Sequence, residues 1–280
     1  MFNQNIKAPV NIPVSKIHPF EGNPYKVLDN EEMNFLIESI QQQGIISPVV
    51  VRPIENTKDE YEVISGHRRL RASVKAGLET VPALIYAVSR DEAAIMLVDS
   101  NLHREHILPS EKAFAYKLKL EAMKHQGITC GQVGHKSRDE ISDTDSGRQV
   151  QRYIRLTYLI PELLELVDEK RVAFTPAVEL SYLNEVEQAD LVEEICICDA
   201  TPNLSQAQRL RAISREEGLT PEHIGEILAE EKANQREKIK IPAERIRRFF
   251  PKSYTTEQIE EAIVKICESR YRARQGRDSR

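Results

Sequence analysis

The spacing of apolar residues changes near Val88 of the 280-residue chain. Before that point, β-branched runs of strand length alternate with segments of helical period, and beyond it the helical period alone remains. The pattern predicts strands over residues 11–14, 45–53, 61–64 and 81–88, and helices over residues 31–43 and 70–78. A mixed α/β unit ending near Val88 is therefore expected.

Beyond Val88, helices are predicted over residues 90–101 and 111–126. Two shorter helices, 137–143 and 147–159, flank the tight turn Thr144-Asp145-Ser146, which is the layout of a helix-turn-helix. From Pro161 onward the pattern is helical in pieces that end at prolines. The second half of the chain is therefore expected to be all-α.

The stretch Tyr61–Arg71 predicts a strand, a tight turn at Ser65-Gly66 and a helix. The first N–H groups of a helix have no partner within the helix, so this end attracts phosphate. Arg68, Arg69 and Arg71 add positive charge where the helix dipole favours negative charge, so we expect them to need an anion. A solvated basic helix end explains the same residues at least as well.

The second helix of the predicted helix-turn-helix contains no acidic residue between Ser146 and Leu159. We expect Val150, Ile154 and Tyr158 to face inward. The outward, DNA-binding residues are then Ser146, Arg148, Gln149, Gln151, Arg152 and Arg155. Arginine and glutamine read base edges and contact phosphates, so this helix favours DNA binding. An amphipathic helix with a solvated polar face is the alternative.

Charge is unevenly distributed, although the net charge is only −5. Residues 162–231 carry 17 acidic and 5 basic residues, whereas residues 232–280 carry 14 basic and 7 acidic residues. The two segments are expected to have different neighbours, or to contact each other.

Four cysteines are too few and too scattered for a disulfide framework, and Cys196 and Cys198 are expected to be buried thiols. The sequence lacks an apolar run of about 18 residues and a signal peptide, so a cytoplasmic protein without a membrane partner is expected.

Three segments, in the order in which they occur along the chain, resemble motifs of the ParB/RepB-type partition proteins. The segments are Gly44–Arg52, which resembles the family's Gly-Leu-Ile-Gln-Pro strand entry, Ser65–Ala72, which resembles its Gly-Glu-Arg-Arg phosphate loop, and Ser100–Glu105, which resembles its Glu-Asn-x-x-Arg-Glu box. After the predicted helix-turn-helix, Arg155–Pro161 is similar to a family segment of the form Leu-Arg-Leu-Leu-x-Leu-Pro.

The resemblance implies an α+β ParB/sulfiredoxin-like domain at residues 1–105, an all-α helix-turn-helix domain at 106–200 and a helical C-terminal segment at 201–280. It implies a homodimeric partition protein, associated with the nucleoid or a plasmid, that binds a centromere-like site in double-stranded DNA and has a ParA-type ATPase partner. It further implies a CTP-binding clamp with Mg²⁺ at Asn101. The implied nucleotide-binding residues are Ser65, Gly66, His67, Arg68, Arg69, Asn101, Arg104 and Glu105.

Three substitutions separate the chain from this pattern. Ser47, His67 and Ser100 stand where the family has glutamine, glutamate and glutamate. Serine is a weak Mg²⁺ ligand and not a general base at pH 7, so only weak CTPase activity, or none, is expected. A site-specific DNA-binding transcriptional regulator with a vestigial nucleotide pocket therefore stays open. Sulfiredoxin chemistry is excluded because Gly66 replaces the nucleophilic cysteine.

Overall fold

The computed structural model describes residues 8–104, 106–126, 145–230, 243–251 and 254–278. Contacts divide the chain into two units, residues 1–230 and 231–280. Along the described parts of the chain, the first unit contains a sheet and ten α-helices, and the second contains two α-helices.

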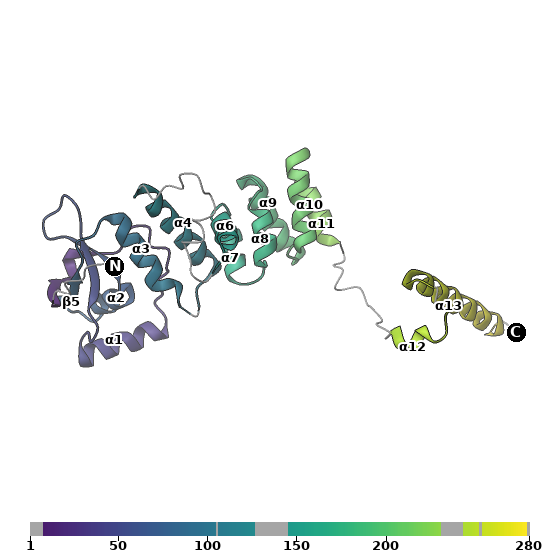
Figure 1. Ribbon diagram of the computed structural model, residues 1–280, viewed down its shortest axis with the longest axis horizontal. Helices are drawn as coiled ribbons and strands as arrows, with labels where there is room; N and C mark the ends of the chain where they lie inside the picture. Colours follow the sequence, from purple (N-terminus) through teal and green to yellow (C-terminus); the bar gives the residue numbers. More distant parts are fainter. Residues whose placement is uncertain (1–7, 105, 127–144, 231–242, 252–253, 279–280) are drawn as a thin grey trace. The chain divides into compact units, whose positions relative to one another are not determined.

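The N-terminal region contains a five-stranded mixed sheet (Figure 1). Its strands are β1 (Val10–Pro13), β2 (Ile17–His18), β3 (Val49–Pro53), β4 (Tyr61–Ser65) and β5 (Thr80–Ile85), in the order β1-β5-β3-β4-β2. The pairs β1–β5 and β3–β4 are antiparallel, and the pairs β3–β5 and β2–β4 are parallel. The mixed α/β prediction is confirmed.

Strand β3 begins four residues later than the apolar pattern predicted. Ile46 is 79% exposed, so the run from Ile45 is not a buried strand throughout. The segment leads away from Gly44, whose φ of 71° ends the preceding helix. Strand β5 likewise ends at Ile85 rather than at Val88.

Helices cover both faces of the sheet because adjacent strand residues point to opposite sides. Val63 of β4 packs with Leu70 of α2 (His67–Lys75), and α1 (Glu31–Gln43) packs against α2 in turn. The next residue, Ile64, packs with α3 (Arg90–Leu102) and α4 (Pro109–His125). The ends of α1 are as predicted: the Asn30 side chain accepts from the Met33 N–H at 3.1 Å.

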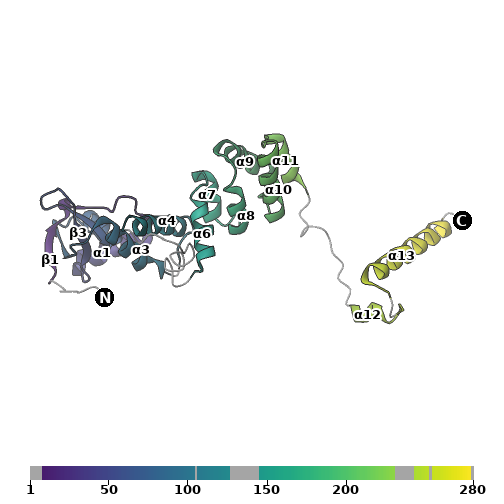
Figure 2. The same cartoon turned by 45° about the horizontal axis from the view of Figure 1, so that its top comes forward.

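Six further helices complete the first unit and follow one another in chain order (Figure 2). They are α6 (Gly147–Leu156), α7 (Pro161–Asp168), α8 (Phe174–Leu180), α9 (Glu185–Cys198), α10 (Leu204–Glu216) and α11 (Pro221–Ala229). One apolar core runs through them, from Leu156 to Leu228. The all-α prediction for this region is confirmed.

The second unit contains α12 (Ala243–Arg247) and α13 (Thr256–Asp278). On α13, Ile259 and Ile263 are half-buried, whereas Val264 and Ile266 are each 56% exposed. Along the described parts of the chain, no helix is both long enough and apolar enough to cross a membrane.

Two expectations about burial are wrong. Cys196 and Cys198 are exposed, because the buried face of α9 runs through Leu191 and Ile195. Tyr158 is 59% exposed, because α6 ends at Leu156 and the helical period stops with it. The predicted helix over residues 137–143 lies outside the described residues.

Candidate functional site

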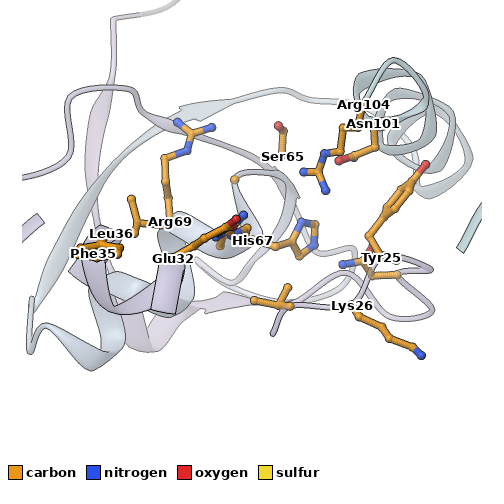
Figure 3. A pocket seen from close by; sticks show the side chains of 14 residues that line it. Tyr25, Lys26, Glu32, Phe35, Leu36, Ser65, His67, Arg69, Asn101 and Arg104 are labelled. Carbon is orange, nitrogen blue, oxygen red and sulfur yellow. Dashed lines mark hydrogen bonds and ion pairs between the residues drawn. The ribbon is translucent and has the colours of Figure 1, made fainter. Parts of the chain in front are cut away.

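One cavity of about 560 Å³ opens at the start of α2 (Figure 3). Seven of the eight residues expected at a nucleotide site line it: Ser65, Gly66, His67, Arg68, Arg69, Asn101 and Arg104. Glu105 lies outside the described residues. In Figure 3, Asn101 and Arg104 lie on one side and Arg69 on the other, with Ser65 and His67 between them. The α2 turn and the end of α3 therefore meet around a single space.

Gly66 makes the turn into α2 with a φ of 99°, a conformation that favours glycine. A Cβ at this position would lie 3.0 Å from Cγ1 of the buried Val49 and 3.2 Å from Nη2 of Arg69. The first turn of α2 contains no acidic residue and receives no side-chain cap. Its N–H groups therefore remain suited to an anion.

The three arginines of α2 differ in their partners. Arg68 pairs with Glu32 at 2.9 Å, and Arg71 donates to both oxygens of Asp29. The expectation that Arg68 and Arg71 need an external anion is therefore wrong, because each pairs with a carboxylate of the same chain about 40 positions earlier. Arg69 instead donates through Nη1 to two uncharged acceptors, the carbonyls of Ser47 (2.5 Å) and Pro48 (2.8 Å).

Partial burial lowers the pKa of Arg69, which still leaves a guanidinium cationic at pH 7. Two carbonyl dipoles hold this cation without neutralising it. A guanidinium has five N–H donors, and Arg69 uses only those on Nη1 for its two hydrogen bonds to carbonyls. Arg69 is thus the α2 arginine best placed to bind an anionic ligand in the cavity.

His67 lines the cavity, and its ring lies next to the Arg104 and Tyr25 side chains (Figure 3). Burial, reinforced by the charge of Arg104, lowers the pKa of His67 to about 4, so the imidazole is neutral at pH 7. Within the described residues its buried Nε2 has no hydrogen-bond partner. Buried polar atoms are normally paired, so the unpaired nitrogen is unfavourable for the fold, and because it is shielded from solvent a ligand would reach it only if the His67 ring moved.

Asn101 and Arg104 come from the end of α3. Asn101 is buried, and its Nδ2 donates to the Leu97 carbonyl at 2.7 Å, which leaves its side-chain oxygen as an acceptor. The Arg104 guanidinium lies 5.7 Å from the centre of the Tyr25 ring. In the described parts of the chain, no group of three or more His, Cys, Asp and Glu side chains is arranged to hold a metal ion.

Half of the cavity lining was not predicted from the sequence. These residues are Asn23, Tyr25, Lys26, Val27, Glu32, Phe35 and Leu36. Residues 23–27, called the pocket loop below, overlap the turn between Pro19 and Pro24, and their sequence contains no recognised functional motif. Phe35 is 68% exposed on α1. An aromatic residue at a polar position of this helix was the one feature of the sequence that indicated a binding surface there.

Helix α6 presents the residues predicted to bind DNA. Ser146 accepts the Gln149 N–H at 3.3 Å and so caps the helix, and Arg148 is exposed. Arg152 is half-buried: it donates to Gln149 Oε1 at 3.2 Å and to Thr175 Oγ1 at 2.9 Å. These polar partners orient the guanidinium without an acidic residue.

Arg155 does not project freely from α6, contrary to the prediction. It donates to the carbonyl of Ser181 at 2.7 Å and to its hydroxyl at 3.1 Å. Its guanidinium lies 4.5 Å from the centre of the Tyr158 ring and 4.0 Å from that of Tyr182. Arg155 therefore attaches α6 to the turn after α8.

Comparisons with known proteins agree with the resemblance. The family described as ParB N-terminal domain matches residues 3–102. A nucleoid occlusion protein of Listeria innocua is 31% identical over 193 residues, or 69% of this chain and 64% of that protein. The chromosome-partitioning protein Spo0J of Thermus thermophilus is 31% identical over 202 residues, or 72% of this chain and 70% of that protein. The match thus spans less than two thirds of the Listeria protein.

Two solved structures of C-terminally truncated ParB from Caulobacter crescentus are also similar. The complex with the centromeric parS site has a TM-score of 0.43 at 21% identity and covers 72% of this chain and 98% of that chain. The complex with CTP-gamma-S has a TM-score of 0.33 at 23% identity and covers 68% and 99%.

Proposed function

Because the chain belongs to the ParB family of chromosome-partitioning and nucleoid-occlusion proteins, we propose that it is a dimeric DNA clamp whose pocket binds CTP. One observation carries the nucleotide part of this proposal. Seven residues from two separate motifs line one cavity that has the size of small-molecule sites.

The cavity offers a different group to each part of a nucleoside triphosphate. The N–H groups at the start of α2, with Arg69 and Arg104, suit the phosphates. Phe35 and Leu36 add an apolar wall for the ribose or base. CTP is proposed over other nucleotides from the family alone.

Mg²⁺ is proposed to enter with the triphosphate. The side-chain oxygen of Asn101 is a ligand type that Mg²⁺ accepts, and in such sites substrate phosphates and water supply most of the coordination. The side-chain oxygen of Asn101 without a cluster of carboxylates is therefore sufficient for an ion that the phosphates and water mostly coordinate. Bound there, the ion would neutralise phosphate charge.

Turnover is proposed to be slow or absent. Ser100 is exposed, and its hydroxyl donates to the Leu97 carbonyl at 3.0 Å. The neighbouring carboxylate, Asp99, pairs with Lys119 at 2.5 Å. Asp99 is thus committed to α4 and does not replace the glutamate of the family motif.

DNA binding is proposed for α6, through Ser146, Arg148, Gln149, Gln151 and Arg152, with Arg155 holding the helix in place. Support comes from the acid-free surface of α6 and from the neutral partners that orient Arg152. The second unit is proposed to bind the same unit of another copy, since α13 exposes Val264 and Ile266. A centromere-like DNA site and a ParA-type ATPase are the proposed partners.

A transcriptional regulator with a vestigial pocket is the second candidate. It is favoured by the Arg68–Glu32 and Arg71–Asp29 pairs, which already neutralise two of the three α2 arginines. Filter binding of radiolabelled CTP and ATP separates the clamp from the regulator. The assay is run with and without a duplex that the wild-type chain selects from a random-sequence pool. The clamp predicts retention of CTP that the duplex changes. Selection of a duplex without retention of either nucleotide supports the regulator.

A further inference from the structure

The pocket loop is attached to the helical region at the N-terminus of α4. The Lys26 N–H donates to Glu111 Oε1 at 2.9 Å, and the Lys26 ammonium lies 3.9 Å from Asp168. Ser110 donates to the same Asp168 carboxylate through its N–H (3.0 Å) and its hydroxyl (2.5 Å). We call these four residues, Lys26, Ser110, Glu111 and Asp168, the α4 junction.

Asp168 occupies an unfavourable position for its own helix. It is the last residue of α7, where the helix dipole disfavours a carboxylate, and its side chain is only 9% exposed. A carboxylate removed from water needs partners, and it finds them in the unpaired donors at the start of α4. Leu108, the N-cap of α4, has no side-chain acceptor of its own. Asp168 thus caps α4 from another helix.

One side of the α4 junction reaches the cavity. Four residues of the pocket loop, Asn23, Tyr25, Lys26 and Val27, line it. The loop's conformation is held by the Tyr25 N–H, which donates to Asn23 Oδ1 at 3.1 Å, and by the buried Tyr25 ring. A ligand that contacts the loop therefore acts on the Lys26 N–H and its bond to Glu111.

The other side of the α4 junction reaches α6. Ala113 of α4, Leu156 of α6 and Leu163 of α7 belong to one buried cluster, and Tyr116 of α4 packs with Val150 of α6 in another. Close-packed helices resist independent movement. A displacement at the start of α4 is thus passed to the helix that we propose to bind DNA.

We propose that the α4 junction couples the cavity to α6, with Asp168 as the positioning residue. This inference rests on the proposed function, in which the cavity binds a nucleotide and α6 binds DNA. In one state of the pocket loop, Lys26 is bonded to Glu111 and Asp168, and in the other state these bonds are broken. A ligand at the cavity or at α6 that prefers one state changes the affinity of the other site. Binding linkage makes the effect reciprocal.

The test measures the affinity of the full chain for its selected duplex, with and without Mg-CTP. Wild type is expected to show a ratio in the usual range for allosteric coupling, about 5- to 150-fold. In Asp168→Asn the ratio is expected to fall below about threefold, while the affinity for each ligand alone stays within about threefold of wild type. Glu165→Gln removes the same charge from an exposed position of α7 and is expected to keep the wild-type ratio. A wild-type ratio in Asp168→Asn overturns the proposal.

A second readout does not depend on nucleotide. Addition of the duplex alone is expected to change hydrogen exchange at the Lys26 N–H in wild type and not in Asp168→Asn. If wild type binds no nucleotide, the proposed function fails, and the exchange result alone decides the coupling. No change at Lys26 in wild type overturns it. Should Asp168→Asn fail to fold, Ser110→Ala, which keeps the Ser110 N–H bond, is expected to reduce both effects, and an unchanged response in that variant overturns the inference.

Discussion

Replacing Gly66 by alanine tests the geometry of the α2 turn. The φ of 99° costs an L-residue about 1–2 kcal/mol. The new Cβ would also lie 3.0 Å from Cγ1 of Val49, which is fully buried, so that side chain can shift only against its own packed neighbours. Such overpacking costs about 1–3 kcal/mol, so the free energy of unfolding is expected to fall by about 2–5 kcal/mol.

Gly77→Ala is the matched control. Gly77 has a φ of 77°, and a Cβ there would meet no atom within 4 Å. Only the backbone cost of about 1–2 kcal/mol applies to it. Urea denaturation should therefore show the larger loss in Gly66→Ala. Because the Cβ also lies 3.2 Å from Arg69 Nη2, CTP affinity should fall in Gly66→Ala and not in Gly77→Ala. Equal losses of stability in both variants would refute the close approach at Gly66.

Three further outcomes are expected. The pKa of His67 is about 4 in the fold and 6.5 in a free chain, so the unfolded state takes up a proton first as pH falls from 6.5 toward 4. Stability should drop by about 1–2 kcal/mol at pH 5, and urea denaturation of His67→Asn should show a smaller drop. Arg152→Ala should weaken binding to the selected duplex by about 1–3 kcal/mol, whereas Arg155→Ala should lower the melting temperature through loss of its Ser181 bonds; the reverse outcome would contradict their assignment. A chain ending at Glu230 keeps the α6–α11 core and should sediment as a monomer without nucleotide, and a dimer would place the contact outside the second unit.

Local features of the sequence were sufficient where the interaction is itself local. Asn30 and Gly44 set the ends of α1 because capping involves residues within one turn. The turn at Gly66 was predictable because a single residue determines its conformation. The convergence of this turn with Asn101 required the family's order of motifs, since nothing local connects residues 35 positions apart.

Long-range partners were not predictable from the sequence. Asp29 and Glu32 precede the arginines that they neutralise by about 40 residues, and the apolar pattern does not reveal which acid meets which base. Arg155 looked like a DNA contact because its helix is acid-free, yet Tyr182 and Ser181 from a later turn hold it. The pocket loop was missed because its contribution comes from position and backbone rather than from residue type.

Calorimetric titration of the full chain with Mg-CTP tests the nucleotide pocket most directly. Wild type is expected to bind one nucleotide per chain, and Arg69→Ala is expected to lose about tenfold to hundredfold in affinity through loss of a charge-assisted contact. Arg71→Ala removes the same charge from α2 at a residue that does not line the cavity, and it should bind as wild type does. Absence of CTP binding by wild type, or equal binding by Arg69→Ala and wild type, would contradict the nucleotide pocket.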